Sequence, residues 1–448
     1  MTTTSKTDRP DLIQIDYPQI NNNLLLFFCG YVVSWYLQIG YRIPILGTIR
    51  FEFIYAAVLT ALALFLTPRL DLECPLLKYV LLYFLVIVIQ VPFSYDFDTS
   101  YDVFVNRIVK FTFMSFFIVS FVRSPKHLKY FLAAFLLACL KMGQEGLIGK
   151  ITGNLIWENQ EIMRLHGSTP NYTHPNSFAG MALGTLPFLY YLWPLSNKYI
   201  KLLLLLIGLL SLNIVIYTGS RTGYIGLLAF IGYIFILSNN KNKFLVRFIL
   251  LSFLALPLIP SQYIGRFDST FADKENEGGS IRTRKEILKD AMQIFVENPF
   301  GVGVAAFPKK RMDTFSRMQD THNLYLEIAT NLGFQGLIIV GLLIYKLLTT
   351  LYRIKSLSAN LINNICNDGR QCSNLFLDDL RLIEAVALAT SAFVVIRLAL
   401  GLFGMDLYEI YWWFAIGITL SLYSMMNKVQ IAIDKYGLQT SCCETLDN

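Results

Sequence analysis

The stretch FEFIYAAVLTALALFLT, residues 51–67, is almost entirely apolar and contains a single acidic residue, Glu52. A run of about 20 mostly apolar residues is long enough to cross the hydrocarbon core of a bilayer as a helix. A second run of this kind, FLVRFILLSFLALPLIP, occupies residues 244–260. Both runs predict membrane-spanning helices and indicate the class of fold for the rest of the chain.

The composition of the whole chain agrees with this class. Of its 448 residues, 54% are hydrophobic and 15% are charged, and the mean hydropathy is +0.49. Soluble proteins carry about 25% charged residues, so the composition argues against a disordered chain and against an ordinary cytosolic enzyme. The formal net charge of +7 would suggest nucleic-acid binding in a soluble protein. In a membrane protein Lys and Arg collect on the cytoplasmic side, and no nucleic-acid partner is expected.

Hydrophobic stretches predict twelve membrane spans. The prediction is an all-α integral membrane protein, in which residues 1–448 form a single polytopic membrane domain. One large loop, residues 261–321, is inserted between the ninth and the tenth helix. The predicted spans are residues 22–39, 51–67, 76–93, 103–121, 128–148, 176–195, 199–217, 221–238, 244–260, 323–349, 382–402 and 408–426.

The distribution of Lys and Arg predicts the orientation of the chain. With the N-terminus in the cytoplasm, 17 Lys and Arg residues fall in the inside loops and tails, and five fall in the short outside loops. Cytoplasmic loops carry an excess of positive charge, so both termini are predicted to be cytoplasmic. The outside then holds two long segments, residues 149–175 and 261–321. Because long ordered loops are usually functional, we expect the site in these two segments.

The large outside loop contains an amphipathic segment, IRTRKEILKDAMQIF at residues 281–295, which is stopped by Asn298 and Pro299. Its apolar residues recur at helical spacing, and the segment is predicted to lie along the membrane surface. These apolar residues are Ile287, Leu288, Met292 and Phe295.

Two basic clusters lie in the same loop. Arg side chains can grip a phosphate bidentately, and contact with anionic lipid headgroups is the alternative. The first cluster is Arg282, Arg284, Lys285 and Lys289, and the second is Lys309, Lys310, Arg311 and Arg317.

The segment DTHNLYLEIATNLGFQG, residues 320–336, places His322 at the predicted outer mouth of the tenth span. Asp320 or Thr321 is expected to cap this helix. An unperturbed imidazole titrates near pH 6.5, so its neutral form is available as a general base at neutral pH. A structural role at the membrane interface is the alternative for His322.

The spacing in this segment resembles the signature of the bacterial O-antigen ligase family. That signature is a His, then Asn, Ser or Gln, nine residues, and Gly-x-x-Gly. His322, Asn323, Gly333 and Gly336 match it without a gap. The two glycines are expected to let neighbouring helices approach closely.

Three further segments resemble parts of this family. TGSRTGYIG at residues 218–226 is similar to its Ser-Arg segment, and RLHGSTPNYTHPNSFAG at 164–180 is similar to its Arg, Gly and Pro-Asn segment. RTRKEILKDAMQIFVENPFGVGVAAF at 282–307 is similar to its stretch of Arg, amphipathic helix, Asn-Pro and Gly-x-Gly. The Trp that commonly follows the Arg in relatives is absent here, so both Arg282 and Arg284 fit the alignment.

The resemblance implies a GT-C-like glycosyltransferase at the periplasmic face of the bacterial inner membrane. Such an enzyme moves a glycan from undecaprenyl pyrophosphate to an acceptor hydroxyl, on lipid A–core or a comparable acceptor. It implies a metal-independent, inverting transfer with no cofactor, and no metal-ligand cluster is visible in the sequence. The implied partners are the lipid-linked glycan donor, a glycan or lipid acceptor, and membrane lipids.

The resemblance also implies roles for individual residues. His322 would take the proton from the attacking hydroxyl. Arg221 and Arg284 would hold the pyrophosphate, with Arg282 as the competitor of Arg284. Arg164 is a third candidate for binding the donor or the acceptor. Contact with lipid headgroups is the alternative for both Arg221 and Arg284.

Other functions share this architecture. A polymerase of O-antigen or exopolysaccharide would use the same carrier, and a protein O-oligosaccharyltransferase is a variant. A transporter remains an alternative, because ionisable residues within spans are costly and often functional, although no repeat of interrupted helices is visible. Some of these charges are expected to pair with one another, and others to line the entry groove of the carrier. They are Arg107, Lys110, Lys141, Glu145, Glu384 and Arg397.

Overall fold

The computed structural model describes residues 15–70, 73–159, 162–255, 280–367 and 374–435. Within the described residues, helices are the regular elements of the first part of the chain. Between α6 and α7 the helix widens into a π-helical turn, η1. The elements are α1 Asn22–Leu37, α2 Ile39–Arg42, α3 Pro44–Thr48, α4 Phe51–Leu66, α5 Leu76–Gln90, α6 Phe97–Val103, η1 Phe104–Val109, α7 Lys110–Phe121 and α8 Pro125–Thr152.

The second part begins with an antiparallel hairpin, in which Ile156 pairs with Leu165 and Trp157 with Arg164. The remaining elements are helical, including a 3₁₀ turn, η2. They are β1 Ile156–Asn159, β2 Ile162–Leu165, η2 Pro170–Tyr172, α9 Pro175–Leu192, α10 Lys198–Tyr217, α11 Arg221–Leu237, α12 Lys241–Ala255, α14 Ser280–Glu297, α15 Phe307–Phe315, α16 Leu324–Asn367, α17 Asn374–Leu400 and α18 Ile410–Lys435.

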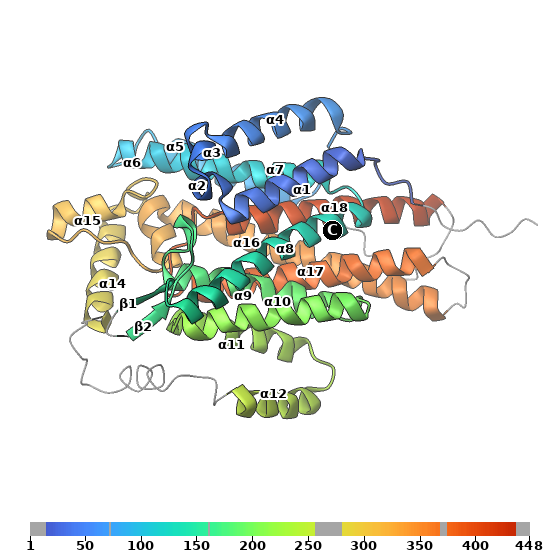
Figure 1. The fold of residues 1–448 in the computed structure, drawn as a ribbon. Coiled ribbons are helices and arrows are strands. Elements are labelled where there is room, and N and C mark those ends of the chain that lie inside the picture. The colour runs from blue at the N-terminus through green and yellow to red at the C-terminus, as the bar shows by residue number, and fades with distance from the viewer. Residues whose placement is uncertain (1–14, 71–72, 160–161, 256–279, 368–373, 436–448) are drawn as a thin grey trace, which may run out of the picture.

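The long helices lie side by side, and α14, α15 and the β1–β2 hairpin gather at one end of the bundle (Figure 1). The hairpin belongs to the first predicted outside segment, and α14 and α15 belong to the second. The arrangement of these elements therefore agrees with the prediction that both segments lie on the same side of the membrane.

Each of the twelve predicted spans falls on a helix of the described residues, and α12 covers its span as far as Ala255. Residues 256–260 of that span lie outside the described residues. Among the described residues, five helical stretches are long and apolar enough to cross a membrane, and α1, α4, α5 and α11 are shorter apolar helices. The helices are those of an all-α integral membrane protein. The five stretches are Phe97–Phe121, Pro125–Thr152, Lys198–Tyr217, Leu324–Ile365 and Leu375–Leu400.

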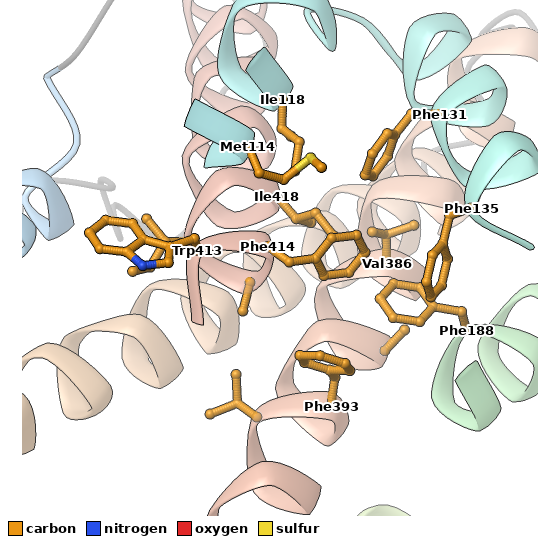
Figure 2. Packing of buried hydrophobic residues seen from close by; sticks show 14 of the residues in the cluster. Met114, Ile118, Phe131, Phe135, Phe188, Val386, Phe393, Trp413, Phe414 and Ile418 are labelled. Carbon is orange, nitrogen blue, oxygen red and sulfur yellow. The ribbon is translucent and has the colours of Figure 1, made fainter. Parts of the chain in front are cut away.

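Aromatic packing joins the central helices. Phe414 of α18 lies 5.1 Å from Phe135 of α8 and 5.7 Å from Phe393 of α17, between ring centroids. Its ring is also 6.1 Å from that of Phe188 on α9. These separations are typical of favourable aromatic pairs, and Figure 2 shows the rings converging on Phe414. The packing fixes the frame from which the outer loops extend.

Most of the charges predicted within the spans have partners. Lys141 pairs with Glu145, as expected, whereas Arg107 and Arg397 pair with acidic residues of the segment between α17 and α18. Buried ionic groups are tolerated when they are paired in this way. The ion pairs are Lys141–Glu145 (3.5 Å), Arg42–Glu145 (2.7 Å), Arg107–Glu409 (2.9 Å) and Arg397–Asp406 (3.6 Å).

Candidate active site

A cavity of about 800 Å³ lies where α6, η1, α9 and the segment between α17 and α18 meet. Its volume falls within the range of small-molecule sites. His322 lines it, together with His174 at the start of α9 and with three of the charged residues predicted within spans, Arg107, Lys110 and Arg397. The cavity is therefore the centre of the candidate site.

His322 is half-buried and immediately precedes the cap of α16. Its backbone has φ +47°, in the left-handed region that non-glycine residues seldom adopt. Desolvation lowers the pKa of His322, and the positive charges of Arg284 and Arg311 lower it further, while Asp320 opposes them. The imidazole is consequently held in its neutral form, which is the form that a general base requires.

Asn323 caps α16. Its Oδ1 accepts hydrogen bonds from the backbone N–H groups of Tyr325 (3.0 Å) and Leu326 (3.1 Å), and its Nδ2 donates to the carbonyl of Leu402 (3.0 Å). The expectation that Asp320 or Thr321 caps the helix is wrong. The side-chain amide of Asn323 carries both an acceptor and a donor, so it can accept from the free N–H groups at the start of α16 and donate to the neighbouring loop.

The first glycine of the motif marks a break in α16. Gly333 has φ +69° and ψ −166°, which is not helical. The loop after α14 enters this break, where the Val302 N–H donates to the Thr330 carbonyl (2.8 Å) and the Phe334 N–H donates to the Pro299 carbonyl (2.9 Å). A Cβ at Gly333 would lie 2.3 Å from the Phe300 carbonyl carbon. The glycine therefore admits a loop into the break.

The second glycine serves the same break. A Cβ at Gly336 would lie 2.2 Å from Cβ of Leu332, on the preceding turn of the same helix. The expectation that Gly333 and Gly336 let neighbouring helices approach is therefore wrong in its detail. Both make room for an irregular backbone, which hydropathy does not reveal.

Arg221 is the first residue of α11 and is half-buried. The preceding Ser220 caps this helix by accepting from the Gly223 N–H (3.0 Å), and its hydroxyl donates to Oδ1 of Asn176 (2.8 Å). The Ser-Arg segment thus fixes the start of α11, and with it the position from which Arg221 extends.

Arg284 lies on α14, with its guanidinium carbon 5.7 Å from the centre of the Phe403 ring. Desolvation lowers the pKa of Arg284, and the nearby positive charge of Arg221 lowers it further. Arg284 in turn lowers the pKa of His322. Arg284 therefore lies within electrostatic range of Arg221 on one side and of His322 on the other, so that residues of three distant segments follow one another in the order Arg221, Arg284, His322.

The other two arginines differ in position. Arg282 lies on α14, but its side chain is outside the described residues. Arg164 is buried, with Nε donating to the Thr218 carbonyl (2.8 Å) and a terminal nitrogen donating to Oδ1 of Asn176 (2.9 Å). These bonds point to a positioning role for Arg164, because they join the hairpin to the ends of α9 and α10.

One face of α14 packs against the protein. Ala291 and Ile294 are buried in a cluster with Val302 and Phe307, and Ile287 is also buried, whereas Leu288 and Met292 are about half exposed. The helix and its end at Asn298–Pro299 are confirmed. Its apolar residues extend around more than one face, so spacing alone could not choose which face packs against the protein.

The second basic cluster is partly structural. Arg311 is fully buried, and its Nε and a terminal nitrogen both lie 2.9 Å from Oδ2 of Asp290 on α14. Arg317 pairs with Glu286 at 3.0 Å. These two arginines hold α15 against α14, which is a different role from the phosphate contact suggested by the sequence.

The comparisons with known proteins bear on the same region. Residues 202–341 match the family model described as O-antigen ligase. This segment is therefore similar to an O-antigen ligase domain. The matched segment contains Arg221, Arg284 and His322 together with the glycines of the α16 break, whereas Arg164 lies before it. No curated protein matches the chain.

Sequence reasoning gave no part in the chemistry to two residues near His322, namely His174 and Asp320. His174 lines the cavity, and its pKa is lowered by desolvation and then by the charges of Arg164 and His322. Asp320 is partly desolvated, which raises its pKa, while His322 and Arg107 oppose that rise. The Pro-Asn segment around His174 was the sequence feature that could have indicated a role for His174. Its position near His322 is visible only in the fold.

Proposed function

We propose that this chain is a membrane glycosyltransferase that moves a glycan from undecaprenyl pyrophosphate to an acceptor hydroxyl at the periplasmic face of the bacterial inner membrane. The acceptor is lipid A–core or a comparable molecule, both termini are cytoplasmic, and the fold is GT-C-like with twelve spans. One observation carries the proposal. Within the segment that is similar to an O-antigen ligase domain, His322 lines a cavity together with Phe403, whose ring centre lies 5.7 Å from the guanidinium carbon of Arg284.

Each of the candidate residues has a distinct role in the proposed reaction. The acceptor oxygen bonds to the anomeric carbon as the bond from that carbon to the pyrophosphate oxygen breaks, which inverts the configuration. His322 takes the hydroxyl proton, and Arg221 and Arg284 stabilise the charge that grows on the leaving pyrophosphate. Electrostatic donors of this kind typically contribute about a hundredfold or more in rate. The sugar–pyrophosphate bond supplies the driving energy, so the proposed transfer uses neither ATP nor a metal ion.

His322→Ala tests the base. We expect the variant to insert and fold normally and to lose glycan transfer, because the change removes the imidazole that accepts the hydroxyl proton. His166→Ala is the matched control, since His166 is on the same predicted side and does not line the cavity. Glycan profiles of cells complemented with each variant give the measurement. Normal product in the His322→Ala strain would refute the assignment.

Arg284→Lys and Arg221→Lys test the pyrophosphate contact. Each change keeps the positive charge but removes the planar, bidentate geometry. We expect each to lower the transfer rate about a hundredfold. Arg317→Lys is the control, because Arg317 follows α15, forms an exposed ion pair with Glu286 and does not line the cavity. Near-wild-type rates in both test variants would place pyrophosphate binding elsewhere.

A polymerase acting on the same carrier is the second candidate, because it needs the same base and the same pyrophosphate contacts. Deleting the gene separates the two functions. Long glycans that accumulate on the carrier indicate a lost ligase, whereas single repeat units indicate a lost polymerase.

A further inference from the structure

One wall of the cavity carries polar side chains that the proposed transfer does not use. Asp102, Asn106 and Lys110 follow one another at intervals of four residues along α6, η1 and α7, and all three line the cavity. We call these three residues the polar stripe. Nδ2 of Asn106 donates to Oδ1 of Asp102 at 2.6 Å. The stripe includes a π-helical turn, a rare element that is frequent at functional sites.

Aromatic side chains line the same cavity. Trp35, Tyr41, Phe111 and Tyr411 contribute to its walls. A sugar presents hydroxyl groups around its edge and apolar C–H groups on its faces. Specific pockets combine apolar and aromatic surface with a few polar groups that fix orientation. The polar stripe together with these rings therefore fits a sugar residue.

The two arginines that line the cavity both form ion pairs with carboxylates of the protein. Arg107 pairs with Glu409 at 2.9 Å, and Arg397 pairs with Asp406 at 3.6 Å. Arg397 is also buried, and it donates to the Gly180 carbonyl at 2.8 Å. Neither guanidinium therefore offers an uncompensated charge to an anionic ligand.

The remaining charges of the lining are more acidic than basic. Glu52 accepts from the Gly40 N–H at 2.6 Å, and Asp102 accepts from Asn106, so both carboxylates have neutral donors that leave their charge uncompensated. Lys110 is the remaining cation of this lining. A carboxylate or phosphate placed here would face a net negative wall, and charges closer together than the Debye length of about 8 Å still repel each other at physiological ionic strength.

We propose that this cavity takes a sugar residue without a charged substituent, and that the polar stripe selects against sugars that carry a carboxylate or a phosphate. The inference rests on the proposed function, which places the reacting hydroxyl beside His322. Arg221 and Arg284 then attract the pyrophosphate, while the acidic wall keeps a second anion out of the sugar position. The sugar is either the first residue of the donor or the acceptor residue.

The test is saturation-transfer NMR on the purified full-length protein. The neutral probes are the methyl glycosides of glucose, galactose and N-acetylglucosamine, and the acidic probes are methyl glucuronide and methyl galacturonide. We expect the best neutral probe to bind at least fivefold more tightly than its acidic counterpart. Equal or tighter binding of the acidic probes, or binding of none of the five, overturns the proposal.

Variants of the polar stripe sharpen the test. Asn106→Ala should weaken the neutral probe at least threefold, and Asp102→Asn should reduce the discrimination against the acidic probes. Asp98→Asn is the matched control, because Asp98 lies one turn earlier on α6 and does not line the cavity. If Asp102→Asn and Asp98→Asn leave the discrimination equally unchanged, the stripe does not select the sugar.

Two further measurements separate the sources of failure. Calorimetry with inorganic pyrophosphate on the wild type and on Arg284→Lys tests the proposed function alone. Intact pyrophosphate binding without sugar discrimination overturns only the inference, whereas discrimination without any effect of Arg284→Lys overturns only the pyrophosphate contact.

Neutral probes that still bind in the presence of undecaprenyl pyrophosphate occupy the acceptor position, and probes that compete with it occupy the donor position.

Discussion

Gly333→Ala should destabilise the protein severely, although it adds only one methyl group. The backbone at Gly333 has φ +69° and ψ −166°, a region that is essentially restricted to glycine. The new Cβ would lie 2.3 Å from the Phe300 carbonyl carbon, 2.5 Å from the Pro299 oxygen and 2.7 Å from the Gly301 nitrogen. All three are backbone atoms, so the clash cannot be relieved by rotating a side chain.

The magnitude follows from what must move. Holding a non-glycine residue in this conformation costs about 1–3 kcal/mol. Expelling the loop would also break three backbone hydrogen bonds, each contributing about 1 kcal/mol net. They are Val302 N–H to Thr330 (2.8 Å), Gly303 N–H to Asn331 (3.0 Å) and Phe334 N–H to Pro299 (2.9 Å). We therefore expect a loss of about 4–6 kcal/mol in the free energy of unfolding.

Gly341→Ala is the matched control. Gly341 lies on the same helix, and a Cβ there would meet no atom within 4 Å. Alanine is favoured over glycine within a helix by about 1 kcal/mol, so this variant should be neutral or slightly stabilising. Scanning fluorimetry of the purified proteins in detergent gives the apparent Tm. We expect a fall of about 5 °C or more for Gly333→Ala and none for Gly341→Ala.

Hydrogen exchange locates the effect within the molecule. The amides of Val302, Gly303 and Phe334 should exchange slowly in the wild type and rapidly in Gly333→Ala. An unchanged Tm together with unchanged protection of these amides would refute the inserted-loop geometry.

Two further predictions concern charge. Arg311→Met should destabilise the protein by about 3 kcal/mol, because the buried carboxylate of Asp290 then keeps only its longer contact with Arg317, at 3.7 Å. Adding Asp290→Leu should restore most of the apparent Tm, and no recovery would contradict this reasoning. Asp320→Asn should move the acid limb of the pH–rate profile to lower pH. The neutral imidazole of His322 is the active form, and Asp320 raises the pKa of His322, so removing that charge lowers the pKa. A shift of the limb to higher pH would contradict the assignment of His322 as the base.

The helices themselves could be predicted from the sequence, because burial in lipid requires long apolar runs. Residues 51–67 illustrate this, since α4 covers Phe51–Leu66. The ends of helices on the predicted cytoplasmic side were less predictable. α16 continues to Asn367, well beyond the predicted end at residue 349, because a helix that leaves the membrane can continue with polar residues.

The sequence predicted which segments contribute residues to the candidate site, but not how those residues lie relative to one another. The His motif located His322, but it carried no information on the distance to Arg221, which lies about a hundred residues earlier in the chain. The cap at Asn323 and the π-helical turn η1 also depend on contacts with other segments, so local spacing could not reveal them. The contribution of the segment between α17 and α18 had no motif, since Gly401 and Leu402 act there through backbone carbonyls.

The break at Gly333 explains how two separate segments can fix the positions of His322 and Arg284 relative to each other. The short first part of α16 runs from the break back to Leu324, nine residues or about 13 Å at 1.5 Å per residue. α14 runs from the inserted loop back toward Arg284, about 20 Å from Glu297 by the same rise. Both are rigid helices that start from one junction, and α14 packs against α16. The junction therefore sets where the base and the guanidinium lie relative to each other, without any bond between them. On this argument the proposed active site includes the glycines and the Asn-Pro-Phe-Gly loop as well as His322, because they fix the geometry that the proposed transfer requires.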